Sequence, residues 1–159
     1  MDNKRLSKKR EIQAAKDIGG KAHINSGAMW FCKNDMSDEI WSCEDKFTFD
    51  IKYSIKYSII NKLEKHALKI NKLPMLRFGF EKENKNYALV EKKHLKEYLL
   101  DIDNILLFKT TKNSILFKLK DLMQLANINN ILCEIFFEKY NKNYIIITWE
   151  YFVEIHNLR

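Results

Sequence analysis

One segment, residues 35–48, constrains the fold and the chemistry of this chain more than any other. Residues 40–47 within it are rich in apolar and aromatic side chains, which predicts a β-strand. Side chains at positions i and i+2 of a strand share a face, so we expect Glu44 and Lys46 to point to one side of a sheet and Asp45 to the other. The backbone alone would then hold a carboxylate beside an amine.

Asp35 lies shortly before this strand, and the intervening residues 36–39 favour a turn. We expect a hairpin that brings the carboxylate of Asp35 beside that of Glu44. Two carboxylates and an ammonium group on one face suit a hard divalent cation and a water molecule. The alternative is an acid-x-Lys pair that decorates an exposed strand, which is the commoner meaning of such a pair.

The basic residues are concentrated at the start of the chain. Residues 1–34 hold eight basic and three acidic residues, so they contribute +5 of the net charge of +7. Such a patch favours a polyanion, and nucleic acid is the commonest one, although basic tails are also often only solvated. With 159 residues, 46% of them hydrophobic, the chain is expected to form one domain with a substantial core.

The cysteines and histidines form no recognisable site. Cys32, Cys43 and Cys133 are odd in number and widely spaced, which fits a reducing compartment and gives no zinc motif. The histidines are scattered along the chain. No run approaches the ~18 apolar residues of a membrane span and no signal peptide is visible, so we expect a cytoplasmic protein (of a bacterial, archaeal or phage-infected host cell) with no membrane partner.

The rest of the chain predicts helices and strands in alternation. Ser7 is expected to cap a first helix that runs to about Ile18 and that Gly19 and Gly20 end. A second helix is expected over residues 54–70, where apolar residues recur at helical spacing (Ile55, Ile59, Leu63, Ala67 and Ile70). The other expected elements are strands at 21–24 and 28–32 around a turn at 25–27, an antiparallel pair at 75–80 and 87–90 around a turn at 84–86, and a helix at 91–100.

The last third of the chain resembles the middle. Residues 81–87 read Glu-Lys-Glu-Asn-Lys-Asn-Tyr, and residues 138–144, 57 positions later, read Glu-Lys-Tyr-Asn-Lys-Asn-Tyr. We interpret residues 104–159 as a degenerate half-repeat that extends the core or forms an interface; chance similarity in an Asn- and Lys-rich chain is the alternative. In this repeat residues 107–110 take the place of residues 44–47, so the acid is lost and a lysine is retained.

These features follow one another in a familiar order. A basic helix carries Glu11 and ends in Gly-Gly; then come a Ser-Gly-Ala loop at residues 26–28, Asp35, a hairpin, Glu44-x-Lys46, a long helix and a Pro-x-Leu-x-Phe strand at residues 74–78. Over about residues 4–100 this order resembles the PD-(D/E)XK nuclease superfamily, and within it the archaeal-type Holliday junction resolvases and their phage relatives.

The resemblance implies a fold and a set of catalytic residues. The expected fold is α/β, with a restriction-endonuclease-like mixed central sheet flanked by helices; residues 1–103 would form the nuclease core and residues 104–159 a C-terminal α/β extension on the same core. Asp35 and Glu44 match the family's metal-binding acids, Lys46 its lysine, Glu11 its helix glutamate and Ser26 the loop serine that approaches the scissile phosphate. The metal ligands would be Glu11, Asp35 and Glu44, and the metal Mg²⁺, for which Mn²⁺ is expected to substitute.

Two positions depart from the family pattern. Asn34 stands where the superfamily name has proline. Asp45 stands where a small or apolar residue is usual, and it would point to the buried face of the sheet, where an unpaired carboxylate is costly. Asp45 therefore needs a partner or an exposed position.

The basic front of the chain is expected to bind the DNA backbone without reading sequence. The residues assigned to this contact are Lys4, Arg5, Lys8, Lys9, Arg10 and Lys33. The resemblance implies that a homodimer cleaves four-way or other branched DNA by phosphodiester hydrolysis, in recombination and repair. Two alternatives stay open: a restriction-like or DNA-degrading nuclease of the same fold, and a non-catalytic DNA-binding protein.

Overall fold

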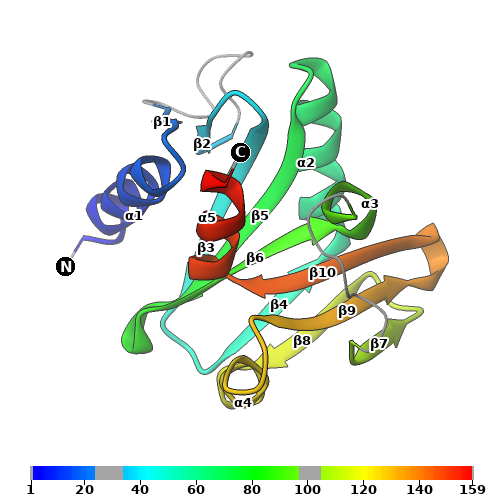
Figure 1. Cartoon of the computed structure of the whole chain (residues 1–159). Helices are drawn as coiled ribbons and strands as arrows, with labels where there is room; N and C mark the ends of the chain where they lie inside the picture. Colours follow the sequence, from blue (N-terminus) through cyan, green and yellow to red (C-terminus); the bar gives the residue numbers. More distant parts are fainter. Residues whose placement is uncertain (1, 24–33, 97–104, 159) are drawn as a thin grey trace.

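A computed structural model describes residues 2–23, 34–96 and 105–158 (Figure 1). The described chain forms one eight-stranded mixed sheet of order β1-β2-β3-β5-β6-β10-β9-β7 and a two-stranded ribbon of β4 and β8. The strands are β1 (Lys21–Ala22), β2 (Met36–Ser37), β3 (Trp41–Thr48), β4 (Lys52–Lys56), β5 (Leu73–Phe80), β6 (Lys85–Glu91), β7 (Leu107–Thr110), β8 (Ser114–Lys118), β9 (Ile131–Phe137) and β10 (Lys142–Thr148). The α-helices are α1 (Asn3–Asp17), α2 (Tyr57–Lys69), α3 (Lys92–Leu95), α4 (Leu119–Ala126) and α5 (Trp149–Asn157), and the 3-10 turns are η1 (Glu81–Glu83) and η2 (Glu138–Tyr140).

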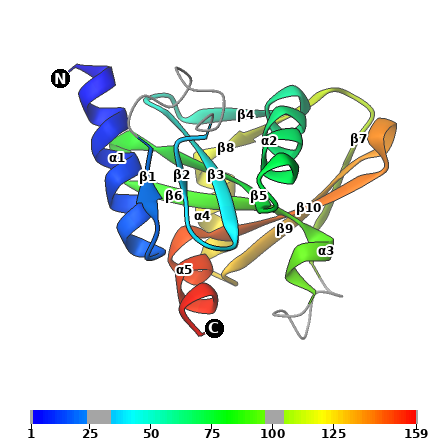
Figure 2. The same ribbon diagram turned by 90° about the horizontal axis from the view of Figure 1, so that it is seen from above.

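Different elements cover the two faces of the eight-stranded sheet. The β4–β8 ribbon, α2 and α4 pack on one face, over a core that includes Phe78 and Ile146. Helices α1 and α5 pack on the other face, over a core that includes Met75 and Ile147 (Figure 2). Neighbouring strand residues belong to opposite cores, as the period of two in a strand requires. The expected general class, a mixed sheet flanked by helices, is confirmed.

The expected strands and turns of the middle segment are present. β3 pairs in parallel with β5 after the crossover through α2, and β5 pairs antiparallel with β6. Between β5 and β6 the chain makes the turn η1 and then Asn84, whose φ of 48° lies in the left-handed region that asparagine tolerates better than most residues. The predicted hairpin at residues 75–90 is therefore confirmed.

The two halves of the described chain carry the same elements in the same order. The first half runs β3-β4-α2-β5-η1-β6-α3 and the second runs β7-β8-α4-β9-η2-β10-α5. Even the turns agree, because η2 is followed by Asn141 with φ 50°, as η1 is followed by Asn84 with φ 48°.

The halves are related by an approximate two-fold axis. β6 and β10 are antiparallel neighbours: Tyr87 faces Thr148, and Tyr144, the counterpart of Tyr87 57 residues later, faces Glu91. The ribbon shows the same exchange, since Lys52, the first residue of β4, faces Lys118, the last residue of β8. The second half thus continues the sheet and core of the first.

The strand register shifts the expected alignment of the repeat by one residue. Asp45 faces Arg77 in the β3–β5 pair. The counterpart of Arg77, 57 residues later, is Glu134, and Leu107 faces it in the β7–β9 pair. The segment beginning at Leu107 therefore corresponds to the one beginning at Asp45, not Glu44. The counterpart of Lys46 is Phe108, so the expectation that the second half retains this lysine is wrong.

Two helices begin at residues other than those expected. Asp2, not Ser7, caps α1, because its Oδ1 accepts the backbone N–H of Lys4 at 3.0 Å. α2 begins at Tyr57, and Ile55 belongs to strand β4 instead, where it faces Ile115 of β8. The end of α1 is as expected: Gly19 has φ 63°, a left-handed conformation that glycine adopts without strain.

Some expectations fall on residues outside the described ranges. They are the turn at 25–27, the strand at 28–32 and residues 97–100 of the expected helix at 91–100. Within the described part this helix is the short α3. No helix in the described ranges has the length and apolar content needed to cross a bilayer.

The contact between the halves generates a prediction about stability. Ile146 is fully buried at the centre of the β6–β10 pair, so Ile146→Ala should lower the free energy of unfolding by about 2–5 kcal/mol, measured by urea denaturation. Ile128→Ala is the matched control: Ile128 is 84% exposed. Its loss should stay within about 0.5 kcal/mol. Equal effects of the two substitutions would show that the halves do not share a core.

Candidate active site

The site begins with the predicted hairpin, which the structure contains. β2 pairs antiparallel with β3, with Met36 facing Cys43, and the backbone N–H of Asp35 donates to the Cys43 carbonyl at 3.1 Å. β2 begins at Met36, so its backbone does not pair with the rest of β3. A side chain makes the next bond along this edge instead: Oδ2 of Asp35 accepts the backbone N–H of Asp45 at 2.8 Å. This bond fixes the Asp35 carboxylate next to the residue that follows Glu44.

Glu44 and Lys46 share a face of β3, as their spacing predicts. Their register partners on β5 are Leu76 and Phe78, which belong to the core beneath α2 and the ribbon. The Lys46 ammonium lies 2.5 Å from Glu44 Oε1, with 21% of the Glu44 side chain and 40% of the Lys46 side chain exposed. The pair is therefore near the surface, at the rim of this core.

Glu11 reaches the same place from α1. Its side chain is largely buried, and Ser7, one helical turn earlier, donates its hydroxyl to Glu11 Oε1 at 2.9 Å. The Lys8 ammonium lies 3.4 Å from Oε2 and also donates to the His23 carbonyl at 2.7 Å. Ser7 thus holds a candidate ligand in place, instead of capping the helix.

The three carboxylates repel one another. Burial raises the pKa of Glu44 and so do the charges of Asp35 and Glu11, against the opposing effect of Lys46. Burial and the charge of Asp35 likewise raise the pKa of Glu11. Burial acts to lower the pKa of Lys46, but Glu44 and the neighbouring carboxylates outweigh it and raise that pKa, so the amine is charged at neutral pH.

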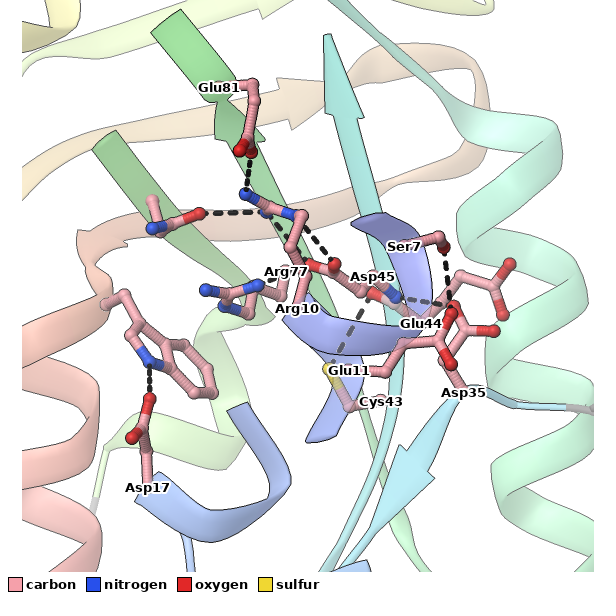
Figure 3. A network of polar contacts seen from close by, with 12 residues as sticks. Ser7, Arg10, Glu11, Asp17, Asp35, Cys43, Glu44, Asp45, Arg77 and Glu81 are labelled. Carbon is pink, nitrogen blue, oxygen red and sulfur yellow. Dashed lines mark hydrogen bonds and ion pairs between the residues drawn. The ribbon is translucent and has the colours of Figure 1, made fainter. Parts of the chain in front are cut away.

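The donor set is chemically suited to a divalent cation. Carboxylates from α1, from the segment before β2 and from β3 lie together in Figure 3, and such hard oxygens are the ligands that Mg²⁺ prefers. Within the described ranges, however, no group of three or more His, Cys, Asp or Glu side chains is arranged so that it could hold a metal ion. Glu44 is paired with Lys46 instead, so a cation at this place must exchange with that ammonium.

Asp45 has the partners that the sequence analysis required. On the opposite face of β3, its carboxylate is 1% exposed and pairs with Arg77 NH1 at 2.7 Å and with Arg10 Nε at 3.1 Å (Figure 3). Arg10 also pairs with Glu81 at 2.9 Å and donates to Asn86 Oδ1 at 2.8 Å. The buried carboxylate is thus satisfied by two guanidinium groups that come from α1 and β5.

Glycine makes this network fit. A Cβ on Gly79 would lie 2.7 Å from NH2 of Arg10 and closer still to Asn86 Oδ1. Only a residue without a side chain leaves room for the guanidinium at this position. The Arg10 guanidinium also lies over the ring of Phe47, 5.0 Å from its centroid.

The basic front divides into two groups. Lys4, Arg5 and Lys9 are exposed on α1, and Lys8 is partly exposed. Arg10 is buried among protein partners, so it holds α1 on the sheet and does not belong to the exposed set expected to contact DNA. Ser26 and Lys33 lie outside the described residues.

Sequence reasoning missed several residues of the site. Arg77 and Ser7 were not singled out as its partners, because their roles depend on residues that fold next to them. Asn34, at the position of the family's proline, is buried and donates to Ser42 Oγ. His23 donates its backbone N–H to the backbone carbonyl of Asp35 at 2.9 Å, and no local pattern marks it.

A pocket of about 390 Å³ lies elsewhere, between α2 and the start of α3. Its charged groups pair mainly with each other: Lys142 lies 3.0 Å from Glu91, which also lies 2.7 Å from Lys93. Glu64, a further lining residue, accepts the Tyr144 hydroxyl at 2.5 Å. These pairs make it a structural ion network and not a second cluster of converging acids.

The sequence matches no family model and none of the curated proteins.

The raised pKa of Glu44 predicts how stability depends on pH. Because the folded-state pKa lies above the ordinary value, the native state binds more protons than the unfolded state as pH rises above that value, and stability falls over this window. Glu44→Gln should therefore raise the thermal midpoint at neutral pH in chelator-containing buffer and flatten its pH dependence.

Glu91 is the control of opposite sign. Burial acts to raise its pKa, but bonds from Lys93 and Lys142 outweigh this and lower it, so its charge stabilises the fold above the ordinary pKa. Glu91→Gln should lower the thermal midpoint at neutral pH. A fall for Glu44→Gln as well would contradict the idea that the carboxylates at the site repel one another.

Removing the charge of Asp45 should destabilise the protein strongly. Asp45→Asn leaves Arg10 and Arg77 buried without their shared counter-charge, which should cost about 3–5 kcal/mol of unfolding free energy. Glu154→Gln, at an exposed position inside α5, is the control and should change it by less than about 0.5 kcal/mol. A small effect at Asp45 in urea denaturation would show that the two arginines do not depend on it.

Proposed function

We propose that this protein is a Mg²⁺-dependent endonuclease that hydrolyses phosphodiester bonds in branched DNA, with the four-way junction as its leading substrate. One observation carries the proposal: acids from three separate segments, Glu11, Asp35 and Glu44, converge at the edge of β3 beside Lys46. Burial and the neighbouring carboxylates raise the pKa values of Glu11 and Glu44, and a bound cation would relieve the repulsion among the three acids.

Each residue has a role that follows from its contacts. Glu11, Asp35 and Glu44 would hold the cation, which when bound stabilises charge on the phosphate and makes a water more acidic. Ser7 orients Glu11, and the backbone N–H of Asp45 orients Asp35. Lys46 keeps its proton at neutral pH, so it would stabilise negative charge on the phosphate and not act as a base.

The exposed basic residues of α1 suit a DNA backbone. Lys4, Arg5 and Lys9 lie on the helix that also supplies Glu11, so phosphate contacts there would place a strand near the acids. Contacts of this kind add affinity without sequence readout. They favour an enzyme that selects DNA by shape.

The internal repeat does not give the described chain a second catalytic site. The described second half has no acid at the position of Glu44 and no lysine at that of Lys46, so one chain would cut one strand. Two coordinated cuts in a junction would then need a homodimer, as the family resemblance implies. The buried free thiols of Cys43 and Cys133 are compatible with the cytoplasm that we propose as its location.

A second candidate function has one observation in its favour. Because Glu44 is paired with Lys46 and no group of the described acids is arranged so that it could hold a metal ion, the site also suits a protein that binds branched DNA without cutting it. The two candidates differ in a single readout, which is strand cleavage.

Cleavage is tested with end-labelled four-way junctions and matched linear duplexes in the presence of Mg²⁺. The wild-type protein should cut the junction preferentially. Asp35→Asn and Glu44→Gln should each lower the cleavage rate at least a hundredfold, because each removes a candidate ligand, while DNA binding changes little.

Glu138→Gln, at an exposed position of η2, is the matched control and should cut at the wild-type rate. Wild-type cleavage by Asp35→Asn would remove the assigned site. Preferential cutting of linear DNA would favour the restriction-like alternative, and binding without any cleavage the non-catalytic one.

A further inference from the structure

The β4–β8 ribbon presents a row of lysines to solvent. Its inner residues, among them Ile55 and Phe117, are buried against the sheet, and alternation along each strand turns Lys52, Lys56 and Lys118 outward, where all three are exposed. Across the described residues, no ion pair involves any of these three lysines.

The arrangement is electrostatically unfavourable for the protein alone. Lys52 and Lys118 are direct cross-strand partners, which places their Cβ atoms about 5 Å apart, and like charges at such positions destabilise a sheet. The packing of the core does not require a lysine at either position, because both side chains point away from it. A counter-charge from outside the chain would relieve the repulsion.

The ends of the ribbon repeat the same feature. Lys56 is the N-cap of α2 and Lys118 the N-cap of α4, and neither forms a side-chain cap. Ser, Thr, Asp and Asn are the preferred residues at this position, and an ammonium group is disfavoured at the positive end of a helix dipole. Lys56 and Lys118 are equivalent under the internal two-fold axis, so the excess of positive charge occurs at both ends.

The ribbon lies next to the candidate active site. Tyr53 of β4 stacks on Phe78 with 5.0 Å between ring centroids, and Phe78 is the β5 neighbour of Lys46. Glu44 and Lys46 therefore point to the side of the sheet that the ribbon covers. Figure 2 shows β4, β8 and α2 on this side, together with the N-terminal end of α1, and α5 on the other.

We propose that the outer face of the β4–β8 ribbon is a second DNA-binding surface, on which Lys52, Lys56 and Lys118 contact the phosphate backbone of the duplex whose strand enters the site at β3. The inference rests on the proposed function for the identity of the partner. Lys52 and Lys56 lie four residues apart, about 13 Å along the strand, so the lysines span several phosphates and not a single small anion. The degenerate half-repeat, which supplies β8, thus contributes a DNA contact after losing the catalytic residues.

The test removes the cross-strand pair with Lys52→Gln/Lys118→Gln and measures binding to short labelled duplexes in chelator, where no cleavage occurs. The slope of log Kd against log salt concentration should fall by about 2, because two phosphate contacts are lost. Affinity near 0.1 M salt should fall roughly tenfold, and equally for unrelated sequences. The thermal midpoint should not fall, since a repulsive pair has been removed.

Lys69→Gln/Lys96→Gln is the matched control. It removes the same charge from two exposed lysines outside the ribbon, one at the C-terminal end of α2 and one after α3, and it should leave the salt slope within experimental error of the wild type. Equal slopes and affinities for the two double variants would overturn the proposal, and so would the absence of DNA binding by the wild-type protein.

The outcome is separable from that of the proposed function. If the wild-type protein cuts DNA but the ribbon variant binds like the control, the ribbon proposal fails and the endonuclease stands. If the wild-type protein binds without cutting and the ribbon variant loses affinity, the endonuclease fails and the ribbon surface stands.

Discussion

The arrangement of the candidate site depends on one buried ion network, in which Arg10 of α1 and Arg77 of β5 share the carboxylate of Asp45. Breaking such a network leaves uncompensated buried charge, so it holds helix, strand and neighbouring strand in one geometry. The same residue offers its backbone N–H to Asp35. Asp45 therefore positions both segments that bring acids to Glu44, without itself pointing toward them.

Alternation along β3 separates stability from chemistry. Asp45 points into the core beneath α1 and α5 and is neutralised there, whereas Glu44 and Lys46 point to the opposite side and remain partly exposed. Glu11 and Glu44 have raised pKa values, so this part of the molecule is less stable than it would be with neutral side chains at these two positions. Unrelieved charge of one sign recurs on the lysine ribbon. The excess of acids at the site suits a bound cation, and the excess of lysines on the adjoining ribbon suits a polyanion that binds together with it.

The sequence allowed the hairpin, the sharing of a face by Glu44 and Lys46, and the β5–β6 pair to be predicted, because each depends on residues close in the chain. The start of α2 was misplaced because Ile55 fits a helical stripe as well as a strand, and its strand partner in β8 is 60 residues away. Arg10 was grouped with its basic neighbours for the same reason: Asp45, its partner, lies 35 residues later. The alignment of the repeat was one residue off, since only the register of the β7–β9 pair fixes it.

The central claim is that Glu11, Asp35 and Glu44 bind one divalent cation at the edge of β3. Anomalous diffraction from a crystal soaked in Mn²⁺ tests it most directly. A single strong anomalous peak is expected within coordination distance of these carboxylates, with the Lys46 ammonium displaced from Glu44. A fully soaked crystal with no peak there, or with Mn²⁺ bound only at other acids, would contradict it.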